Sequence, residues 1–269
     1  MRNAIVGLIV GACTVSGCGG GETGPPTGPT PTVSSVTVSL RDVVLVGTTA
    51  AATATATLTN GQTQSVTTGW RSDATSIASV TDAGTVTGVA NGEATITVGS
   101  GGRDGSKRIR VAPNYDGQWQ GTQIVTACTA TGDFQGTCEE EGGVVGLPFP
   151  VGLLGRHPGD LAVSGEFTIE GLQFPTFTTQ IEADGSSRFS ATTVVEGVRA
   201  EASWQMNSTQ NGRSSGTIRE KYSLPGIASG EVTYDSTFAD VNRTGTTAGP
   251  SSSAAAPIVK RRINPRRPR

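Results

Sequence analysis

The sequence predicts an all-β protein, in which a small β-sandwich is followed by an antiparallel, barrel-like β-domain. Only 16% of the 269 residues are charged, and 38 residues are glycines. Few charges, together with abundant glycine, threonine, serine and valine, favour strands and tight turns over helices. No stretch of the chain keeps an apolar period of 3.6 residues over three turns, which is the pattern of an amphipathic helix.

The first 32 residues are not expected to join a folded core. Residues 1–17 have a basic start, then the apolar stretch Ala4–Ala12, and then small residues. These are the parts of a secretory signal peptide, and the apolar stretch is shorter than the roughly 20 residues of a membrane-spanning helix. Residues 18–32 are rich in proline and glycine, so we expect an extended tether there.

The end of this segment, Val15 to Cys18, reads Val-Ser-Gly-Cys and resembles the lipobox of bacterial lipoproteins. Leucine, rather than valine, is usual at the first position of that motif. The resemblance implies cleavage before Cys18, lipid attachment at Cys18, and several acyl chains that anchor the protein to a membrane. It therefore implies a lipid-anchored protein of the bacterial cell envelope, and Gly19 in place of aspartate favours the outer membrane. An ordinary apolar N-terminus is the alternative.

The chain has four cysteines, and their positions predict one disulfide. Cys13 would leave with the signal peptide and Cys18 would carry lipid. Cys128 and Cys138 then remain as an even pair in an oxidising compartment. A zinc site is the weaker alternative, because zinc usually takes four ligands with short paired spacings and His157 is the only histidine. We expect no metal and no cofactor.

The first folded unit, residues 33–112, has the sequence pattern of a small sandwich. Alternating residues at Ser34–Leu40 and Ala51–Leu58 predict strands, and Asn91-Gly92 predicts a hairpin turn. Trp70 lies between strand-like stretches, as a core aromatic residue would. About seven short strands over this length are typical of a β-sandwich.

Within this unit, the stretch Gly69–Val98 resembles the bacterial immunoglobulin-like group 2 module. The family's ordered motifs (Trp-Ser-Ser, Ile/Val-Ala-x-Val, Gly-x-Val-x-Gly and Gly-x-Ala-x-Ile) correspond here to Trp70, Ile77–Val80, Gly84–Gly88 and Gly92–Ile96. Arg71 stands where serine is common. The resemblance implies an immunoglobulin-like sandwich, used in adhesins and as a spacer in surface proteins, and it implies no catalytic residues.

The second unit, residues 115–243, is also rich in predicted strands. Every second residue of Val198–Met206 is apolar or small, which is the alternation of a strand. Asp184-Gly185 predicts a hairpin that pairs Ser187–Val195 with the preceding stretch, and Pro225-Gly226 predicts another turn. Consecutive hairpins predict an up-and-down sheet, whose closure into a barrel would remove exposed edges. The unit has 7 basic and 16 acidic residues, a net charge of −9.

The opening of the second unit, Gly117-x-Trp119, resembles the start of lipocalin-type barrels, where the tryptophan plugs the barrel floor. The resemblance implies that the barrel encloses a small apolar ligand. The candidate ligand-lining residues are then Trp119, Phe189, Trp204 and Tyr234. A structural tryptophan in any β-domain is the alternative.

No catalytic constellation stands out in the sequence, and we expect no enzyme. His157 stands near Asp160, but no nucleophile-elbow motif accompanies them, so we expect a solvent-facing loop histidine. Residues 139–141 are three glutamates without the spacing of a calcium loop. Glu166 and Glu170 could in principle serve a glycosidase, but carboxylates are common on strand surfaces.

Together these patterns predict a non-enzymatic cell-envelope lipoprotein that displays an adhesion or binding module on a lipid-anchored stalk. The predicted partners are the membrane, through Cys18, and a carbohydrate or protein ligand at the cell surface or outside the cell. A lipocalin-like carrier is the alternative, and an enzyme comes third. Residues 244–269 end in a basic segment, which we expect to be a disordered tail. Nucleic acid is not an expected partner.

Overall fold

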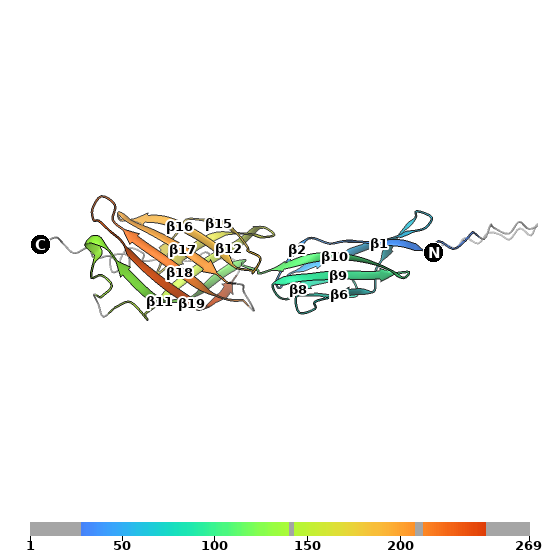
Figure 1. The fold of residues 1–269 in the computed structure, drawn as a ribbon, viewed down its shortest axis with the longest axis horizontal. Coiled ribbons are helices and arrows are strands. Elements are labelled where there is room, and N and C mark those ends of the chain that lie inside the picture. The colour runs from blue at the N-terminus through green and yellow to red at the C-terminus, as the bar shows by residue number, and fades with distance from the viewer. Residues whose placement is uncertain (1–27, 140–142, 208–211, 246–269) are drawn as a thin grey trace, which may run out of the picture.

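The computed structural model describes residues 28–139, 143–207 and 212–245. These residues form two β-units that lie end to end (Figure 1). The prediction of an all-β protein is confirmed, and none of the described residues belongs to a helix long and apolar enough to cross a membrane. The predicted lipidation site Cys18, the signal peptide and most of the basic tail lie outside the described residues.

The first unit contains ten short strands in three sheets, with the orders β1-β4-β5, β2-β10-β9-β6 and β3-β8-β7. The strand pairings are antiparallel except that of β2 with β10, which is parallel, and a single parallel bridge also joins Val46 to Gly88. The strands are β1 (Val33–Ser39), β2 (Val43–Leu45), β3 (Thr49–Ala51), β4 (Thr53–Leu58), β5 (Thr63–Val66), β6 (Trp70–Ser72), β7 (Ala78–Val80), β8 (Thr85–Gly88), β9 (Gly92–Ser100) and β10 (Arg103–Ala112).

Trp70 belongs to the core of the first unit, as its position in the sequence predicts. Its side chain is buried and shares an apolar cluster with Ile96 and Val86. Gly84 lies against the indole with a φ of +79°, and a Cβ built there would be 2.7 Å from the carbonyl oxygen of Ala52. The glycine of the family motif is therefore needed both for its backbone conformation and for the space it leaves.

The second unit is an antiparallel up-and-down sheet with the strand order β14-β13-β12-β11-β19-β18-β17-β16, and β15 pairs with β13. Because β19 pairs with β11 as well as β18, the first and last strands of the unit are neighbours. The strands are β11 (Gly117–Ala130), β12 (Pro148–Gly159), β13 (Ala162–Ile169), β14 (Leu172–Gln173), β15 (Phe177–Gln180), β16 (Ser187–Val195), β17 (Val198–Met206), β18 (Arg213–Ser223) and β19 (Val232–Gly245).

The sheet curls until β16 meets β15, but this junction, which we call the seam, is barely paired. A single bridge joins Ile181 to Ser187 across it. The predicted hairpin at Asp184-Gly185 is present only as a turn, in which the Gly185 N–H donates to the Glu182 carbonyl oxygen at 2.9 Å. The full partner of β16 is β17, and the unit is therefore barrel-like with one weakly joined seam.

A turn that the sequence analysis did not identify joins β16 to β17. Glu196 and Gly197 form a two-residue connection with φ values of +51° and +83°. Two successive positive φ values are the geometry of a type I′ hairpin turn, whose twist matches the twist of the paired strands. Glu170 and Gly171 have the same pattern between β13 and β14, with φ values of +51° and +80°.

The junction between the two units is packed and is not a free linker. Ala112 and Tyr115 are both fully buried. The Tyr115 hydroxyl donates to the Gly185 carbonyl oxygen at 2.7 Å, and the Arg110 guanidinium donates to the Glu182 carbonyl oxygen. Val43 of the first unit and Ala112 belong to the apolar cluster of the second unit. The two units therefore contact each other around the connecting residues 112–115.

The predicted disulfide between Cys128 and Cys138 is present. It ties the end of β11 to the following loop, which contains the 3-10 turn Gly132–Phe134 and buries the Phe134 ring completely. Opening this bond should lower the free energy of unfolding by about 2–3 kcal/mol, because it closes a short loop. Urea unfolding of the oxidised chain and of a Cys128→Ser/Cys138→Ser variant measures the loss. A difference below about 0.5 kcal/mol would contradict a stabilising role.

Candidate functional site

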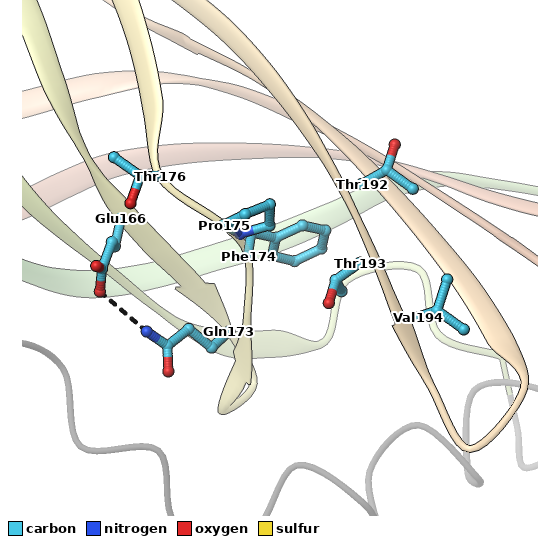
Figure 2. A pocket seen from close by; sticks show the side chains of 8 residues that line it. All are labelled: Glu166, Gln173, Phe174, Pro175, Thr176, Thr192, Thr193 and Val194. Carbon is cyan, nitrogen blue, oxygen red and sulfur yellow. Dashed lines mark hydrogen bonds between the residues drawn. The ribbon is translucent and has the colours of Figure 1, made fainter.

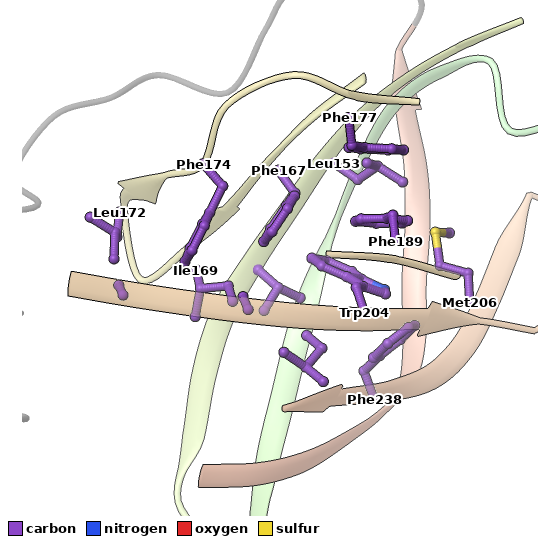
Figure 3. Close-up of a cluster of buried hydrophobic side chains, with 14 of the residues drawn as sticks. Leu153, Phe167, Ile169, Leu172, Phe174, Phe177, Phe189, Trp204, Met206 and Phe238 are labelled. Atoms are coloured by element: carbon purple, nitrogen blue, oxygen red, sulfur yellow. The ribbon is translucent and has the colours of Figure 1, made fainter. Parts of the chain in front are cut away.

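The interior of the second unit is filled by aromatic side chains along its centre (Figure 3). The rings of Phe177 and Phe189 stack with centroids 3.7 Å apart. The indole of Trp204 meets Phe167 edge-on at 5.6 Å and Phe238 at 5.4 Å. At the level of these five rings the sheet therefore encloses a packed core.

The four candidate ligand-lining residues are buried, but they do not form one site. Phe189 and Trp204 lie together, with ring centroids 5.8 Å apart, in the aromatic core. Trp119 lies apart from them, at the end that faces the first unit, and Tyr234 packs edge-on against Tyr222 at 5.9 Å. All four are less than 9% exposed and contact other protein side chains. These residues are buried because they are part of the packed core of the second unit.

Trp119 closes the end of the interior next to the first unit. Its Nε1 donates to the Tyr115 carbonyl oxygen at 2.9 Å, and the Arg243 guanidinium lies 4.9 Å from the ring centroid. A cation over an indole face is attracted by the negative face of the ring. Burial lowers the pKa of Arg243, and the nearby Asp116 carboxylate opposes that shift. Arg243 also donates to the Asn114 carbonyl oxygen, so β19 is hydrogen-bonded to the segment that connects the two units.

His157 lies in this same end region, and the prediction of a solvent-facing loop histidine is wrong. It belongs to β12 and is half-buried, because its ring stacks on Tyr115 at 6.5 Å. Its Nε2 accepts a hydrogen bond from the Tyr115 backbone N–H at 2.9 Å. This bond requires Nε2 to be unprotonated, and burial lowers the pKa of His157 from its ordinary value of 6.5.

Acid should therefore destabilise the protein through His157. A histidine with a lowered pKa in the folded state binds fewer protons than in the unfolded chain, so its contribution to stability is complete above about pH 6.5 and falls at lower pH. His157→Gln keeps an acceptor for the Tyr115 N–H and should weaken this pH dependence. Urea unfolding of both proteins between about pH 5 and pH 8 measures it. Parallel stability profiles for the two proteins would contradict the assignment.

A buried polar cluster, which the sequence analysis missed, lies in the interior of the second unit. The Glu220 carboxylate accepts a hydrogen bond from Gln123 Nε2 at 2.6 Å and another from the Tyr222 hydroxyl. Gln123 and Glu220 are fully buried, and Tyr222 is 3% exposed. The period-2 alternation of Ile218, Glu220 and Tyr222 in β18 is the sequence signal that places all three on the inner face.

This cluster is built to hold a buried carboxylate. Each Glu220 oxygen has a donor, and hydrogen bonds of this kind offset the cost of taking a carboxylate out of water. Small residues stand opposite on the neighbouring strand, where Ala202 pairs with Glu220 and Ala200 pairs with Tyr222. No group of three acidic, histidine or cysteine side chains that could hold a metal occurs in the described ranges.

A groove follows the seam on the outside of the second unit (Figure 2). We call it the seam groove, and its volume is about 600 Å³. Glu166 accepts a hydrogen bond from Gln173 Nε2 at 2.9 Å on one bank. On the other bank Val194 of β16 is 64% exposed. The lining residues are Glu166, Gln173, Phe174, Pro175, Thr176, Thr192, Thr193 and Val194.

The sandwich of the first unit agrees with a known family. Residues 32–111 match the family model of the bacterial Ig-like domain (group 2). The resemblance inferred from the Trp70 and glycine motifs is thus confirmed, and the N-terminal unit is Ig-like in fold. The family match covers less than a third of the chain, and it does not extend to the second unit.

Solved structures of the surface layer protein SbsC are also similar to the chain. For its domains 4–9 the identity is 20%, with 77% of this chain and 31% of that chain covered and a TM-score of 0.26. For its domains 1–6 the identity is 14%, the coverages are 79% and 41%, and the TM-score is 0.27. The chain thus spans less than half the length of each of these solved chains. No curated protein matches the chain.

Proposed function

We propose that the chain is a non-enzymatic lipoprotein of the bacterial cell envelope, in which the second unit is a binding module displayed on a lipid-anchored stalk. The match of residues 32–111 to the bacterial Ig-like domain carries this proposal, because such domains are typical of surface proteins. The lipobox-like residues that end at Cys18, and the proline- and glycine-rich segment after them, support attachment to a membrane.

The packed junction supports the role of a stalk. Tyr115 and Ala112 are fully buried where the chain crosses between units, and an ion pair between Arg41 and Asp160 spans the same junction. A joint held by apolar packing and hydrogen bonds restricts the rotation of one unit against the other. The Ig-like domain would therefore hold the second unit in a defined orientation relative to itself, beyond the tether.

A protein ligand fits the described surface better than a carbohydrate. Sugar rings usually bind by stacking on exposed aromatic side chains. The exposed large apolar residues in the described ranges are all aliphatic: Val89, Ile124, Val145, Leu147, Val194 and Ile227. The packed rings of Phe189 and Trp204 also argue against the alternative of a small-molecule carrier, since an apolar ligand would have to displace them.

The membrane anchor is tested by substitution of its attachment residue. Cys18→Ser should abolish incorporation of a labelled fatty acid and leave an uncleaved precursor, because lipid transfer needs the thiol. Cys13→Ser is the matched control, since it removes a cysteine five residues earlier and should leave labelling unchanged. Unchanged labelling of the Cys18→Ser protein would overturn the lipoprotein assignment. Protease digestion of intact cells, followed by detection of the second unit, tests display at the surface.

A further inference from the structure

We infer that the free edge of β16 along the seam groove binds an extended peptide strand by adding it to the sheet. This inference rests on the proposed function, because it assigns a site and a partner class to the same binding module. The added strand would lie between β16 and the segment Phe174–Thr176 (Figure 2).

Strand β16 is unpaired over most of one side. On its other side it pairs with β17 along its whole length, from Ser187 to Val195. Towards the seam, the first residues of β16 contact β15 and the turn through the bridge at Ser187, through a hydrogen bond from the Thr179 hydroxyl to the Arg188 carbonyl oxygen at 2.5 Å, and through the stacked ring of Phe189. From Ser190 to Val194 no strand of the described part of the chain pairs with this edge.

The register shows which backbone groups face the groove. The two-residue turn at Glu196-Gly197 makes Val195 and Val198 a hydrogen-bonded pair, and such pairs then recur at every second residue of β16. The intervening residues turn their N–H and C=O groups the other way. Ser190, Thr192 and Val194 therefore turn their backbone donors and acceptors towards the seam, and Thr192 and Val194 line the seam groove. Only an extended backbone repeats donors and acceptors with the same spacing.

The neighbouring strand is interrupted beside this edge, which leaves the edge without a partner. β14 ends at Gln173 and β15 begins at Phe177, so the segment between them pairs with no strand. The Phe174 N–H donates to the Phe167 carbonyl oxygen of β13 at 2.9 Å, and the two rings stack at 4.5 Å. These contacts draw the segment towards β13, and Pro175 has no N–H to offer to β16.

The unpaired part of this edge, residues 190–195, lacks the features that normally prevent pairing with another chain. Edge strands are usually protected by charged side chains, proline or bulges. Residues 190–195 read Ser-Ala-Thr-Thr-Val-Val, with neither a charge nor a proline, and their pairing with β17 contains no register shift. Val194 is 64% exposed at the end of this run. A regular and uncharged edge of this kind is well suited to strand addition.

Charge indicates the composition of the partner strand. The second unit has a net charge of −9, and Glu166 lies on the bank opposite β16. Side chains of the added strand alternate between the two faces of the sheet. Those on the inner face would meet Phe174 and Thr193, which favours small apolar residues. Those on the outer face would lie near Glu166, which favours lysine or arginine.

A synthetic peptide with this alternation tests the inference on the full chain. The probe is a fluorescent, end-capped heptapeptide of alternating lysine and valine. The control probe has the same sequence with every backbone nitrogen methylated, so its charge is kept and its hydrogen-bond donors are lost. We expect saturable binding of the first probe, at least tenfold weaker binding of the second, and slower hydrogen exchange at the amides of Thr192 and Val194 in the complex.

Two variants locate the site. Thr192→Pro removes an N–H that faces the groove and should weaken binding at least tenfold, whereas Thr192→Val keeps the N–H and should bind the probe as the parent does. Circular dichroism of Thr192→Pro verifies that the strand still folds. If the proline disrupts β16, Glu166→Gln provides the second variant, and we expect it to weaken binding several-fold at low salt and less at high salt.

Three outcomes would overturn the inference. Equal binding of the methylated peptide would mean that charge alone attracts the probe. Exchange protection at Thr192 and Val194 before the probe is added would mean that another part of the chain, or a second copy, already occupies the edge. Unchanged binding by both Thr192→Pro and Glu166→Gln would place the site elsewhere. None of these measurements depends on Cys18, so failure of the lipid anchor and failure of the peptide site are distinguishable.

Discussion

Replacing Trp204 with alanine is expected to lower the free energy of unfolding of the second unit by roughly 3–5 kcal/mol. The indole is 1% exposed, and its ring meets those of Phe167, Phe189 and Phe238 at 5.4–5.8 Å. Truncation removes these contacts and leaves a cavity that rings fixed in neighbouring strands cannot close. Urea unfolding followed by circular dichroism measures the loss without relying on tryptophan fluorescence, which the substitution itself changes.

Ser203→Ala is the matched control for this prediction. Ser203 precedes Trp204 on β17 and is exposed on the outer face, so its substitution should change the free energy of unfolding by less than about 0.5 kcal/mol. A loss below about 1 kcal/mol for Trp204→Ala would mean that the interior tolerates the missing ring. That result would indicate a loosely filled interior and would favour the function of a small-molecule carrier.

Replacing Glu220 with alanine is expected to destabilise the second unit by roughly 2–5 kcal/mol. The substitution removes the acceptor of two buried donors, Gln123 Nε2 and the Tyr222 hydroxyl. Buried donors without an acceptor retain the full cost of their lost hydration, so the loss should exceed that of an ordinary hydrogen bond. Thermal and urea unfolding of the purified variant measure the effect.

Glu220→Gln separates hydrogen bonding from charge at the same position. Glutamine keeps the size of the side chain and one carbonyl oxygen, and the Tyr222 hydroxyl can accept from its amide. We therefore expect a smaller loss than for Glu220→Ala. If the alanine variant is as stable as the parent, the cluster does not hold the interior together. If the glutamine variant loses as much as the alanine variant, the charge of Glu220 is needed as well as its acceptors.

Local patterns in the sequence predict much of this architecture. The alternation of Val198–Met206 predicts a strand with its apolar side inward, and the structure has β17 there with Ala200, Ala202 and Trp204 buried. The spacing of Trp70 and the following glycines identifies the Ig-like sandwich, and residues 32–111 match that family. These predictions succeed because strand alternation, turn residues and a motif of fixed spacing are all properties of neighbouring residues.

Other features depend on residues that are distant in the sequence. Asp184-Gly185 and Glu196-Gly197 both flank β16, but only the second closes a fully paired hairpin, and the sequence favours the first because aspartate-glycine is the commoner turn pair. The residues around His157 in the sequence do not indicate that its Nε2 accepts a hydrogen bond from the Tyr115 N–H, 42 residues away. In both cases the closure of the sheet decides which groups meet.

The all-β class, the Ig-like character of the first unit and the pairing of Cys128 with Cys138 can all be predicted from the amino-acid sequence. The packed junction, the cluster in which Gln123 reaches Glu220 across 97 residues, and the open seam beside β16 become visible only in the folded chain. This division arises because strand identity follows from the alternation of neighbouring residues. The curvature and register of a closing sheet, in contrast, follow from the sum of its long-range contacts, and these decide which side chains share the interior and which edge stays unpaired.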